Sequence, residues 1–380
     1  MAQRLKTDWI LFSTVVLMVL FGALMIYSAS SVVAQMRMGA SYYFLVRQLI
    51  WIAIAIPLMM FMKRLNYRKL QTPAVAFTAM GLVMILLAVV YFADPRQHRW
   101  IRFGPFGGLQ PSEFAKPALA LFLAYFIALR SRAINSRYTL LPAFLALGFV
   151  TMAVVVADLG TALVLVGTAA VVFFVAGLES RYIVIAFILG IVGCVAAVAA
   201  KPYRLARVVS YVDPQFKTVD KFDKHGWIRS QMKKSITARD TNYQSEQAKI
   251  AVGSGGPIGV GLMQGRQKLF YLPEAHTDTI YAVVGEEFGL FGSAGLLLGF
   301  VVILWRGIRA TVLIPDEFGR YLALGVTTML VIQAFFNMSV VLGMVPTKGI
   351  PLPMISFGGS SLLVTLASLG ILLNVAEHAG

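Results

Sequence analysis

Two carboxylates and an imidazole lie close together in a polar stretch that leads directly into an apolar run. Glu274, His276 and Asp278 precede residues that are almost all apolar from position 280 onward. A carboxylate at the edge of hydrocarbon is costly unless it meets water, a cation or a substrate, which favours a functional role for Asp278. The structural alternative is a helix N-cap, because Thr277 or Asp278 followed by helix formers is a common start signal. A capping residue can also be a catalytic base, so spacing leaves both interpretations open.

Further charged residues occur within apolar segments. Glu113 and Lys116 are three positions apart, share a helix face and can pair, either as scaffold or to hold a phosphate-binding lysine. Asp158 interrupts a long apolar stretch, where it can cap a broken helix or bind a cation or a buried arginine. Glu286 and Glu287 follow Asp278 by about two helical turns. One of them, but not both, can face the same cavity as the aspartate.

A segment rich in proline and glycine, residues 346–361, is too irregular for a helix and too apolar for a solvated loop. At membrane depth such backbone is tolerated only where it lines a cavity or is buried in protein. We therefore expect a re-entrant or mouth-lining segment, with Lys348 pointing into the cavity.

The usual signatures of soluble enzymes are missing from the sequence. It has no Walker loop, dinucleotide fingerprint, His-Glu-x-x-His motif or serine elbow, which argues against a nucleotide cofactor. The single cysteine, Cys194, lies in an apolar run and cannot form an internal disulfide.

The elements that position these residues must cross a membrane. The 380 residues are 58% hydrophobic and only 13% charged, which excludes a soluble globule and predicts an all-α polytopic membrane protein with a single integral membrane domain. Spans need roughly 20 apolar residues. About ten are predicted, near residues 9–33, 45–62, 74–93, 113–129, 140–157, 159–177, 183–200, 279–305, 320–345 and 357–376.

Basic residues predict the orientation. Most of those in short loops fall on one side if the N-terminus is cytoplasmic, and the C-terminus is then cytoplasmic too. The long hydrophilic loop, residues 201–275, then lies outside. Arg99 and Arg102 crowd into a short outer loop against this rule, which an anionic ligand would explain. The formal charge of +16 is spread between spans, so we expect anionic lipid head groups or an anionic substrate as partners rather than nucleic acid. An outward cavity with one acid and many cations suits a lipid-linked phosphate or pyrophosphate.

Six motifs, taken together and in order, resemble the SEDS family, the FtsW and RodA peptidoglycan glycosyltransferases of bacteria. They span nearly the whole chain, and the forms Pro-Glu-Ala-His-Thr-Asp and Pro-Thr-Lys-Gly look more like FtsW. The stretch of residues 215–241 is longer than the corresponding stretch usually is in members of this family. The motifs are Gln110-Pro-Ser-Glu-Phe-Ala-Lys116, Asp158-Leu-Gly-Thr161, Lys249-Ile-Ala-Val-Gly-Ser-Gly-Gly256, Leu272-Pro-Glu-Ala-His-Thr-Asp278, Gly285-Glu-Glu-Phe-Gly289, and Lys348-Gly-Ile-Pro-Leu-Pro with Gly358-Gly-Ser-Ser361.

The resemblance implies an enzyme of the bacterial cytoplasmic membrane that polymerises lipid II into glycan strands on the outer face. The position that matches the family's essential aspartate is Asp278. A carboxylate there can take the proton of a sugar 4-hydroxyl as it attacks an anomeric carbon, with inversion and no covalent intermediate. Cations should assist departure of the pyrophosphate. The residues we expect to contact substrate are Arg99, Arg102, Glu113, Lys116, Arg204, Arg207, Lys249, Arg266, His276, Lys348 and Ser356.

The same resemblance implies a class B penicillin-binding protein as partner, besides lipid II and membrane lipids. A divalent cation, Mg²⁺ or Mn²⁺, is compatible with a pyrophosphate substrate, although no ligand cluster in the sequence identifies one. Two other classes remain open at this point: a lipid II flippase, which also needs a cavity and about ten helices, and a non-catalytic membrane scaffold for a penicillin-binding protein.

Overall fold

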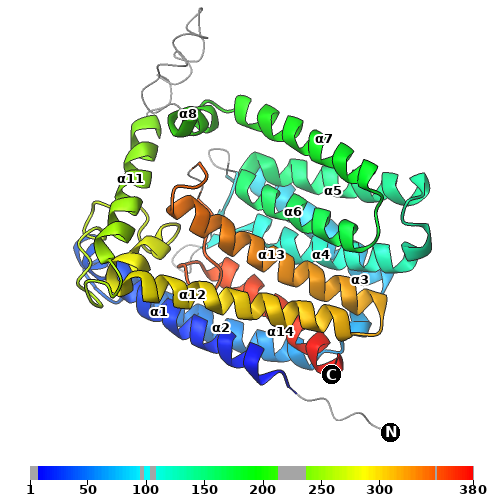
Figure 1. The fold of residues 1–380 in the computed structure, drawn as a ribbon, viewed down its shortest axis with the longest axis horizontal. Helices are drawn as coiled ribbons and strands as arrows, with labels where there is room; N and C mark the ends of the chain where they lie inside the picture. Colours follow the sequence, from blue (N-terminus) through cyan, green and yellow to red (C-terminus); the bar gives the residue numbers. More distant parts are fainter. Residues whose placement is uncertain (1–6, 95–97, 103–107, 213–236, 347–348, 380) are drawn as a thin grey trace, which may run out of the picture.

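The computed structural model describes residues 7–94, 98–102, 108–212, 237–346 and 349–379. Long helices lie side by side and form one bundle (Figure 1). The elements in chain order are α1 (Trp9–Met38), α2 (Tyr43–Arg64), η1 (Tyr67–Leu70), α3 (Pro73–Ala93), β1 (Ile101–Arg102), β2 (Gly108–Leu109), α4 (Pro111–Arg130), η3 (Ser131–Ala133), α5 (Arg137–Ala157), α6 (Leu159–Val175), α7 (Ser180–Ala199), α8 (Pro202–Val212), α11 (Thr237–Gly255), α12 (Ile280–Leu313), α13 (Glu317–Val341) and α14 (Gly359–His378).

Apolar helices occupy the ten predicted spans. In the described part of the chain, nine helices are long and apolar enough to cross a membrane, and α6 is a shorter apolar helix of 17 residues. With α6 these match the ten expected segments. The largest difference is α12, which runs to Leu313 and so extends beyond the expected end at residue 305.

The spans differ in how deeply they are packed. In the most apolar window of α13, 78% of the residues are buried within the protein, whereas the corresponding value for α7 is 0%. The helices α4, α13 and α14 therefore form the centre of the bundle. In a membrane, the side chains of α7 would face mainly lipid, which explains why it is apolar on every side.

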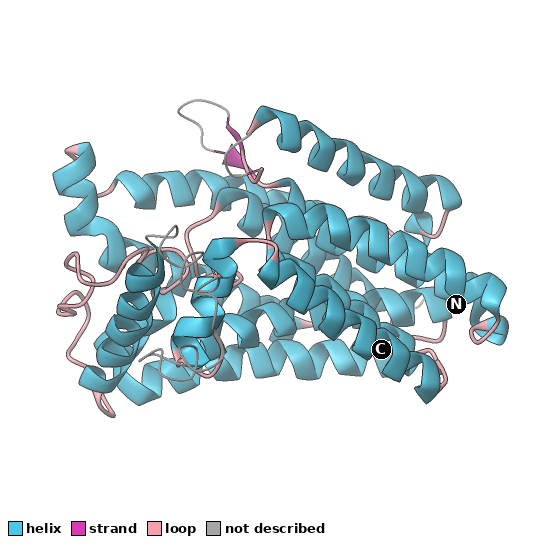
Figure 2. Ribbon diagram, turned by 90° about the horizontal axis from the view of Figure 1, so that it is seen from above, coloured by secondary structure: helices cyan, strands magenta, loops and turns pink. Residues whose placement is uncertain are grey.

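Both chain ends lie at the same end of the bundle, as an even number of crossings requires (Figure 1). The helices α8 and α11 lie at the opposite end, where α11 runs across the direction of the spans. The helix α11 ends at Gly255 and belongs to the segment 201–275 that the sequence analysis assigns to the outer side. The strands β1 and β2 pair in an antiparallel hairpin at the side of the bundle (Figure 2).

The span α12 is broken near its start. Gly289 has φ 63° and ψ −153°, a left-handed conformation that favours glycine, and the helix kinks there. The loop after α11 replaces the lost helical bonds: the Leu290 amide donates to the Gly256 carbonyl at 2.9 Å, and the Val260 amide donates to the Glu286 carbonyl at 3.0 Å. Because these groups are satisfied by protein backbone, the break is tolerated within a membrane span.

Candidate functional site

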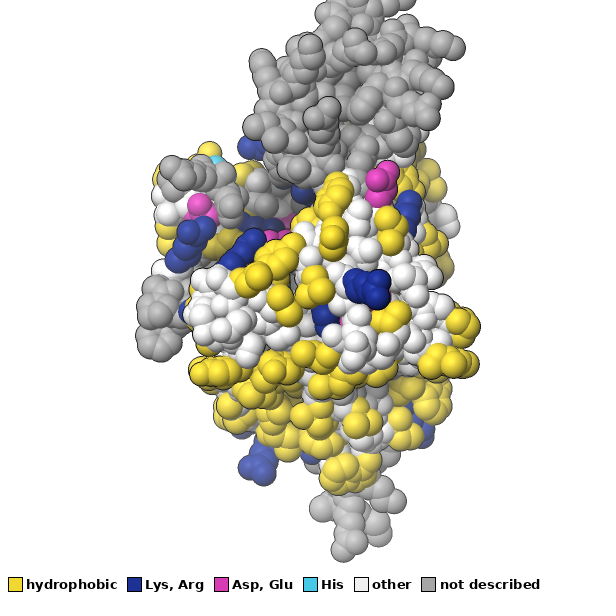
Figure 3. Space-filling model, turned by 90° about the vertical axis from the view of Figure 1, so that its left-hand side faces the viewer, with side chains coloured by type: hydrophobic (Ala, Val, Ile, Leu, Met, Phe, Trp, Pro, Cys, Tyr) yellow, Lys and Arg dark blue, Asp and Glu magenta, His cyan; other side chains and the backbone are white. Residues whose placement is uncertain are grey.

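A polar cavity of about 250 Å³ lies at the end of the bundle opposite the chain termini. Its walls come from the loop before β1, the end of α5, the helices α8 and α11, the loop before α12, and the end of α13. Figure 3 faces this end and shows Lys and Arg side chains beside Asp and Glu side chains in a recess of the surface. The lining residues are Arg99, Ala157, Arg207, Gln244, Ser245, Ala248, Glu274, Asp278, Thr279, Val340, Val341 and Gly349.

Asp278 lines this cavity and does not cap α12. The N-cap of α12 is Thr279, and it makes no side-chain capping bond, so the capping alternative for Thr277 or Asp278 is wrong. Burial raises the pKa of the Asp278 carboxyl to about 6, while the Arg99 charge opposes that shift and the Glu274 charge adds to it. A carboxylate with a pKa near 6 can be deprotonated at neutral pH and still accept a proton, as general-base catalysis requires.

The second carboxylate of the cavity belongs to Glu274. Its backbone is in the left-handed region with φ 52°, which is strained for a residue with a side chain. The turn is held by hydroxyl groups: Thr277 donates to the Glu274 carboxylate at 3.0 Å, and Thr279 donates to the Glu274 carbonyl at 3.1 Å. Backbone strain of this kind concentrates at functional sites because the surrounding contacts must maintain it.

Arg99 enters the cavity from the other side, and Asp158 fixes it there. The guanidinium of Arg99 lies 3.4 Å from the buried Asp158 carboxylate, which also accepts from the Gln110 amide. The other Asp158 oxygen accepts from the amides of Gly160 and Thr161 and so caps α6. Asp158 therefore caps a broken helix and binds an arginine, two of the roles considered for it. Arg99 lies at the cavity as the charge pattern indicated.

The two arginines of α8 separate in space. Arg207 lines the cavity. Arg204 is buried and donates to the carbonyls of Val155 and Ala197, at 2.6 and 3.1 Å. Arg204 thus holds α8 against the ends of α5 and α7 and does not line the cavity.

Residues 349–358, within the segment rich in proline and glycine, pack directly against the Asp278 loop. Gly349 lies so close that a Cβ atom there would be 2.2 Å from Oδ2 of Asp278. Ser356 donates to the Thr277 carbonyl at 2.6 Å, and the Phe357 amide donates to the His276 carbonyl at 2.9 Å. Ser356 is therefore a structural link between the two segments.

His276 packs among aromatic rings. Its ring centroid lies 4.4 Å from that of Phe44 and 5.7 Å from that of Phe357. Burial lowers the pKa of His276, so the ring is neutral at pH 7. His276 supports the loop and does not line the cavity.

Two side-chain amides of α13, which the sequence did not single out, hold the Asp278 loop and the segment 349–358 in place. Asn337 donates both to the Asp278 carbonyl at 2.8 Å and to the Ile350 carbonyl at 2.7 Å. Gln333 donates to the Pro351 carbonyl at 2.8 Å. Both amides are almost completely buried. A buried polar residue within a span was the available signal.

The expected pair of Glu113 and Lys116 is confirmed, with 2.8 Å between Nζ and the carboxylate. Lys116 also donates to the Gln333 side chain. The pair is buried behind the segment that holds Pro351 and does not line the cavity. Through Gln333, the pair helps to hold α13 against that segment.

Glu286 and Glu287 do not line the cavity, contrary to the expectation that one of them faces it. Glu286 accepts from the Arg266 amide at 2.7 Å and thereby holds the outer loop. Glu287 forms a buried ion pair with Lys268, and both groups contact the Ser28 hydroxyl of α1. The acids thus fasten the loop after α11 to the broken start of α12.

The remaining basic candidates lie apart from the cavity. The side chains of Arg102, Lys249 and Arg266 are exposed and do not line it. Lys348 lies outside the described residues, as does most of the longer stretch 215–241. Of the expected basic set, the described structure therefore brings only Arg99 and Arg207 to the cavity with Asp278.

These features define a polytopic membrane protein with a carboxylate and two arginines in a cavity at one end of its spans. The family model described as "Cell cycle protein", for FtsW, RodA and SpoVE, matches residues 8–380. The chain belongs to this family.

Curated relatives agree with the family assignment and with its FtsW-like character. The probable peptidoglycan glycosyltransferase FtsW of Geobacter metallireducens is 39% identical over 379 residues, which cover 98% of this chain and 95% of that protein. The stage V sporulation protein E of Bacillus subtilis is 36% identical over 385 residues and covers 99% of both chains.

Solved structures are similar over the full length. The rod shape determining protein RodA of Thermus thermophilus has a TM-score of 0.68 at 26% identity, covering 99% of this chain and 98% of that one. A chain of a peptidoglycan synthase complex, described as coordinating polymerization and crosslinking, has a TM-score of 0.72 at 26% identity and covers 98% of both chains.

Proposed function

We propose that this chain is a peptidoglycan glycosyltransferase that polymerises lipid II into β-1,4-linked glycan strands. The observation that carries the proposal is the Asp278 carboxylate, with a pKa raised to about 6, in a polar cavity with Arg99 and Arg207. The name of the relative that is 39% identical supports the same activity.

In the proposed reaction Asp278 is the general base. Its carboxylate takes the proton of the acceptor sugar's 4-hydroxyl as that oxygen attacks the anomeric carbon of the donor. The bond between the anomeric carbon and the phosphate oxygen breaks, and the pyrophosphate leaves with the electron pair. Because attack and departure occur on opposite faces in one step, an α-linked donor gives a β-linked product.

Two arginines are placed to stabilise the leaving pyrophosphate. Arg99 and Arg207 line the same cavity as Asp278, and guanidinium groups bind phosphate oxygens through paired N–H donors. Arg99 is oriented by Asp158 at 3.4 Å, so it does not have to be ordered when substrate binds. Fixed charges that meet developing negative charge lower the barrier most.

The cavity also fits a divalent cation on the pyrophosphate. Glu274 contributes a second carboxylate to the lining, and Mg²⁺ is commonly bound by one or two carboxylates together with substrate phosphates. Glu274 would hold such an ion, whose contribution is to neutralise charge on the leaving group. No group of three His, Cys, Asp or Glu side chains suited to a metal occurs in the described ranges.

The proposed orientation places the cavity on the outer face of the bacterial cytoplasmic membrane and both termini in the cytoplasm. The termini lie at the opposite end of the bundle from α8 and α11 (Figure 1), which contribute to the cavity lining, and the basic residues of short loops favour cytoplasmic termini. A class B penicillin-binding protein is the proposed partner, supported by the similarity to a chain of a complex described by polymerization and crosslinking.

Polymerisation in detergent solution tests this function. Purified chain is incubated with lipid II and Mg²⁺, with and without the cognate penicillin-binding protein, and the products are separated by length. An enzyme yields glycan strands in detergent, where no second membrane side exists. A flippase or a scaffold leaves lipid II monomeric there, and that result would refute the proposal.

A further inference from the structure

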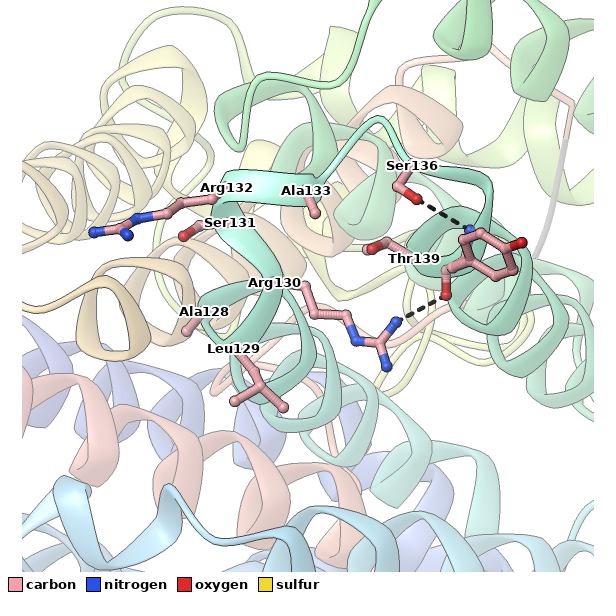
Figure 4. A pocket seen from close by; sticks show the side chains of 9 residues that line it. Ala128, Leu129, Arg130, Ser131, Arg132, Ala133, Ser136 and Thr139 are labelled. Atoms are coloured by element: carbon pink, nitrogen blue, oxygen red, sulfur yellow. Dashed lines mark hydrogen bonds between the residues drawn. The ribbon is translucent and has the colours of Figure 1, made fainter.

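A second cavity, of about 440 Å³, lies at the opposite end of the bundle from Asp278, where α4 turns through η3 into α5. Figure 4 shows its lining: Arg130 turns toward the start of α5, whereas Arg132 extends from the other side of the turn. The proposed glycosyltransferase reaction does not use this cavity. Its lining residues are Ala128, Leu129, Arg130, Ser131, Arg132, Ala133, Ser136, Tyr138 and Thr139.

The polar groups of this cavity match an anion. The lining includes two arginines and four hydroxyl residues, and it includes no acidic residue. Glu179 approaches the same turn through Asn135, but its carboxylate is paired with Arg181 at 2.6 Å. The cavity also contains the start of α5, a helix of 21 residues, and the N-terminal end of a helix favours negative charge.

One hydroxyl in the lining has no partner. Thr139 is 1% exposed, and its hydroxyl makes no hydrogen bond within the described residues. In Figure 4 it is drawn in the lining with no dashed line to a neighbour. The hydroxyl is therefore open to the cavity, where a ligand or a water molecule can accept a hydrogen bond from it.

Arg130 keeps donors available for a ligand. One guanidinium nitrogen donates to the Tyr138 carbonyl at 2.8 Å, and the group lies 5.2 Å from the centre of the Phe126 ring. A guanidinium carries five N–H donors, so the Tyr138 contact positions the side chain and leaves others unused.

The surroundings indicate a membrane lipid rather than a free anion. Leu129 lines the cavity and is 66% exposed, and Leu141 and Leu145 on α5 are each 63% exposed. These apolar side chains belong to spans, so they face hydrocarbon next to the charged turn. A ligand with an anionic head group and acyl chains satisfies both parts of this surface, and basic pockets between spans on the cytoplasmic side are typical of such binding.

We propose that the turn between α4 and α5 binds the phosphodiester head group of an anionic glycerophospholipid of the cytoplasmic leaflet. Arg130 contacts the phosphate, Thr139 donates a hydrogen bond to it, and the acyl chains lie along Leu129 and α5. Arg132, on the other side of the turn, attracts the head group through its charge. The site is separate from the catalytic cavity, so it stands or falls independently of the proposed glycosyltransferase activity.

Titration of the full chain in neutral detergent tests the site. The probes are dihexanoyl phosphatidylglycerol, dihexanoyl phosphatidylcholine and inorganic phosphate, and native mass spectrometry counts the bound molecules. The Arg130→Gln/Arg132→Gln variant removes both charges, while glutamine can still donate to the Tyr138 carbonyl. Arg309→Gln is the matched control, because Arg309 is an exposed arginine near the same end of the bundle.

We expect saturable binding of phosphatidylglycerol to the wild type and much weaker binding of the other two probes. Each arginine removed should weaken that binding about fivefold. Thr139→Val should weaken it further, Thr139→Ser should not, and Arg309→Gln should have no effect. Unchanged binding in the double variant would overturn the proposal. So would inorganic phosphate binding as tightly as phosphatidylglycerol, or an equal loss in Arg309→Gln, which would reveal diffuse attraction to surface charge.

Discussion

Asp278 determines how activity should depend on pH. Burial raises the pKa of its carboxyl to about 6, and a general base works only when deprotonated. Single-turnover polymerisation should therefore be level near pH 7.5 and fall about tenfold for each pH unit below pH 6. A rate that stays constant from pH 7.5 to pH 5 would rule out Asp278 as the titrating base.

Neighbouring charges give this profile an internal control. The Glu274 charge raises the pKa of Asp278 and the Arg99 charge lowers it. Glu274→Gln should accordingly move the acidic limb to lower pH, and Arg99→Gln should move it to higher pH. If both variants shifted the fall in rate at low pH in the same direction, the group that titrates there would not be Asp278.

The same burial predicts that Asp278 reduces stability at neutral pH. Its folded pKa of about 6 lies above the ordinary value of 3.8, so the folded state binds more protons between these values. The free energy of unfolding therefore falls as pH rises through that window, and the full cost is present above pH 6. Asp278→Asn should raise the free energy of unfolding by about 1–2 kcal/mol at pH 7, less than full desolvation would give because Asp278 faces the cavity.

Thermal unfolding in detergent at two pH values checks this prediction. The midpoint of Asp278→Asn should exceed that of the wild type at pH 7 and approach it near pH 4, where both side chains are neutral. A variant less stable than wild type at pH 7 would show that the carboxylate makes net favourable contacts.

At the scale of elements, apolar length alone predicted the spans. Runs of apolar residues long enough to cross a membrane match the observed helices to within a few residues at most ends, including the boundary at Asp158, which caps α6. The kink in α12 could not be predicted in this way. It depends on backbone hydrogen bonds between Gly289's neighbours and a loop that precedes it by about 30 residues, and such pairing leaves no periodic signal.

Asn337 should control the position of Asp278 without touching substrate. Its amide joins the Asp278 and Ile350 carbonyls. Asn337→Leu keeps the approximate volume but leaves both carbonyls without this donor, so we expect a loss of about tenfold to a hundredfold in polymerisation rate. The control is Thr327→Val. Thr327 is buried on the same helix, and its hydroxyl has no hydrogen-bond partner in the described chain. Equal rates for both variants would remove the positioning role.

The buried pair of Lys268 and Glu287 should behave as a unit. Each side chain is at most 3% exposed, so removing one partner leaves an uncompensated charge. Lys268→Met should destabilise the protein by about 3–5 kcal/mol, and adding Glu287→Gln should restore a large part of that loss. Chemical denaturation in mixed micelles measures both. If the double variant lost as much free energy of unfolding as the two single variants lose together, the two charges would not be coupled.

At the scale of the whole molecule, the sequence predicted the fold class, the common end for both termini, and Asp278 as the central carboxylate. It assigned too many residues to the cavity, because neither charge nor membership of a motif shows which way a side chain points. The side chains that bind structural partners instead are those of Arg204, Lys116, Glu286 and Glu287. It missed the amides of α13, since Gln333 and Asn337 are ordinary residue types within an apolar span and acquire their role only from the segment that folds against them.

The most direct test of the central claim compares Asp278→Asn with the wild type in polymerisation of lipid II, with lipid II binding measured in the same preparations. The account predicts that Asp278→Asn folds, binds lipid II with an affinity close to that of the wild type, and loses polymerisation by at least about a hundredfold, since general-base catalysis contributes roughly 10²–10⁴-fold. Polymerisation within about threefold of the wild-type rate, in protein that binds lipid II normally, would contradict the assignment of Asp278 as the catalytic base.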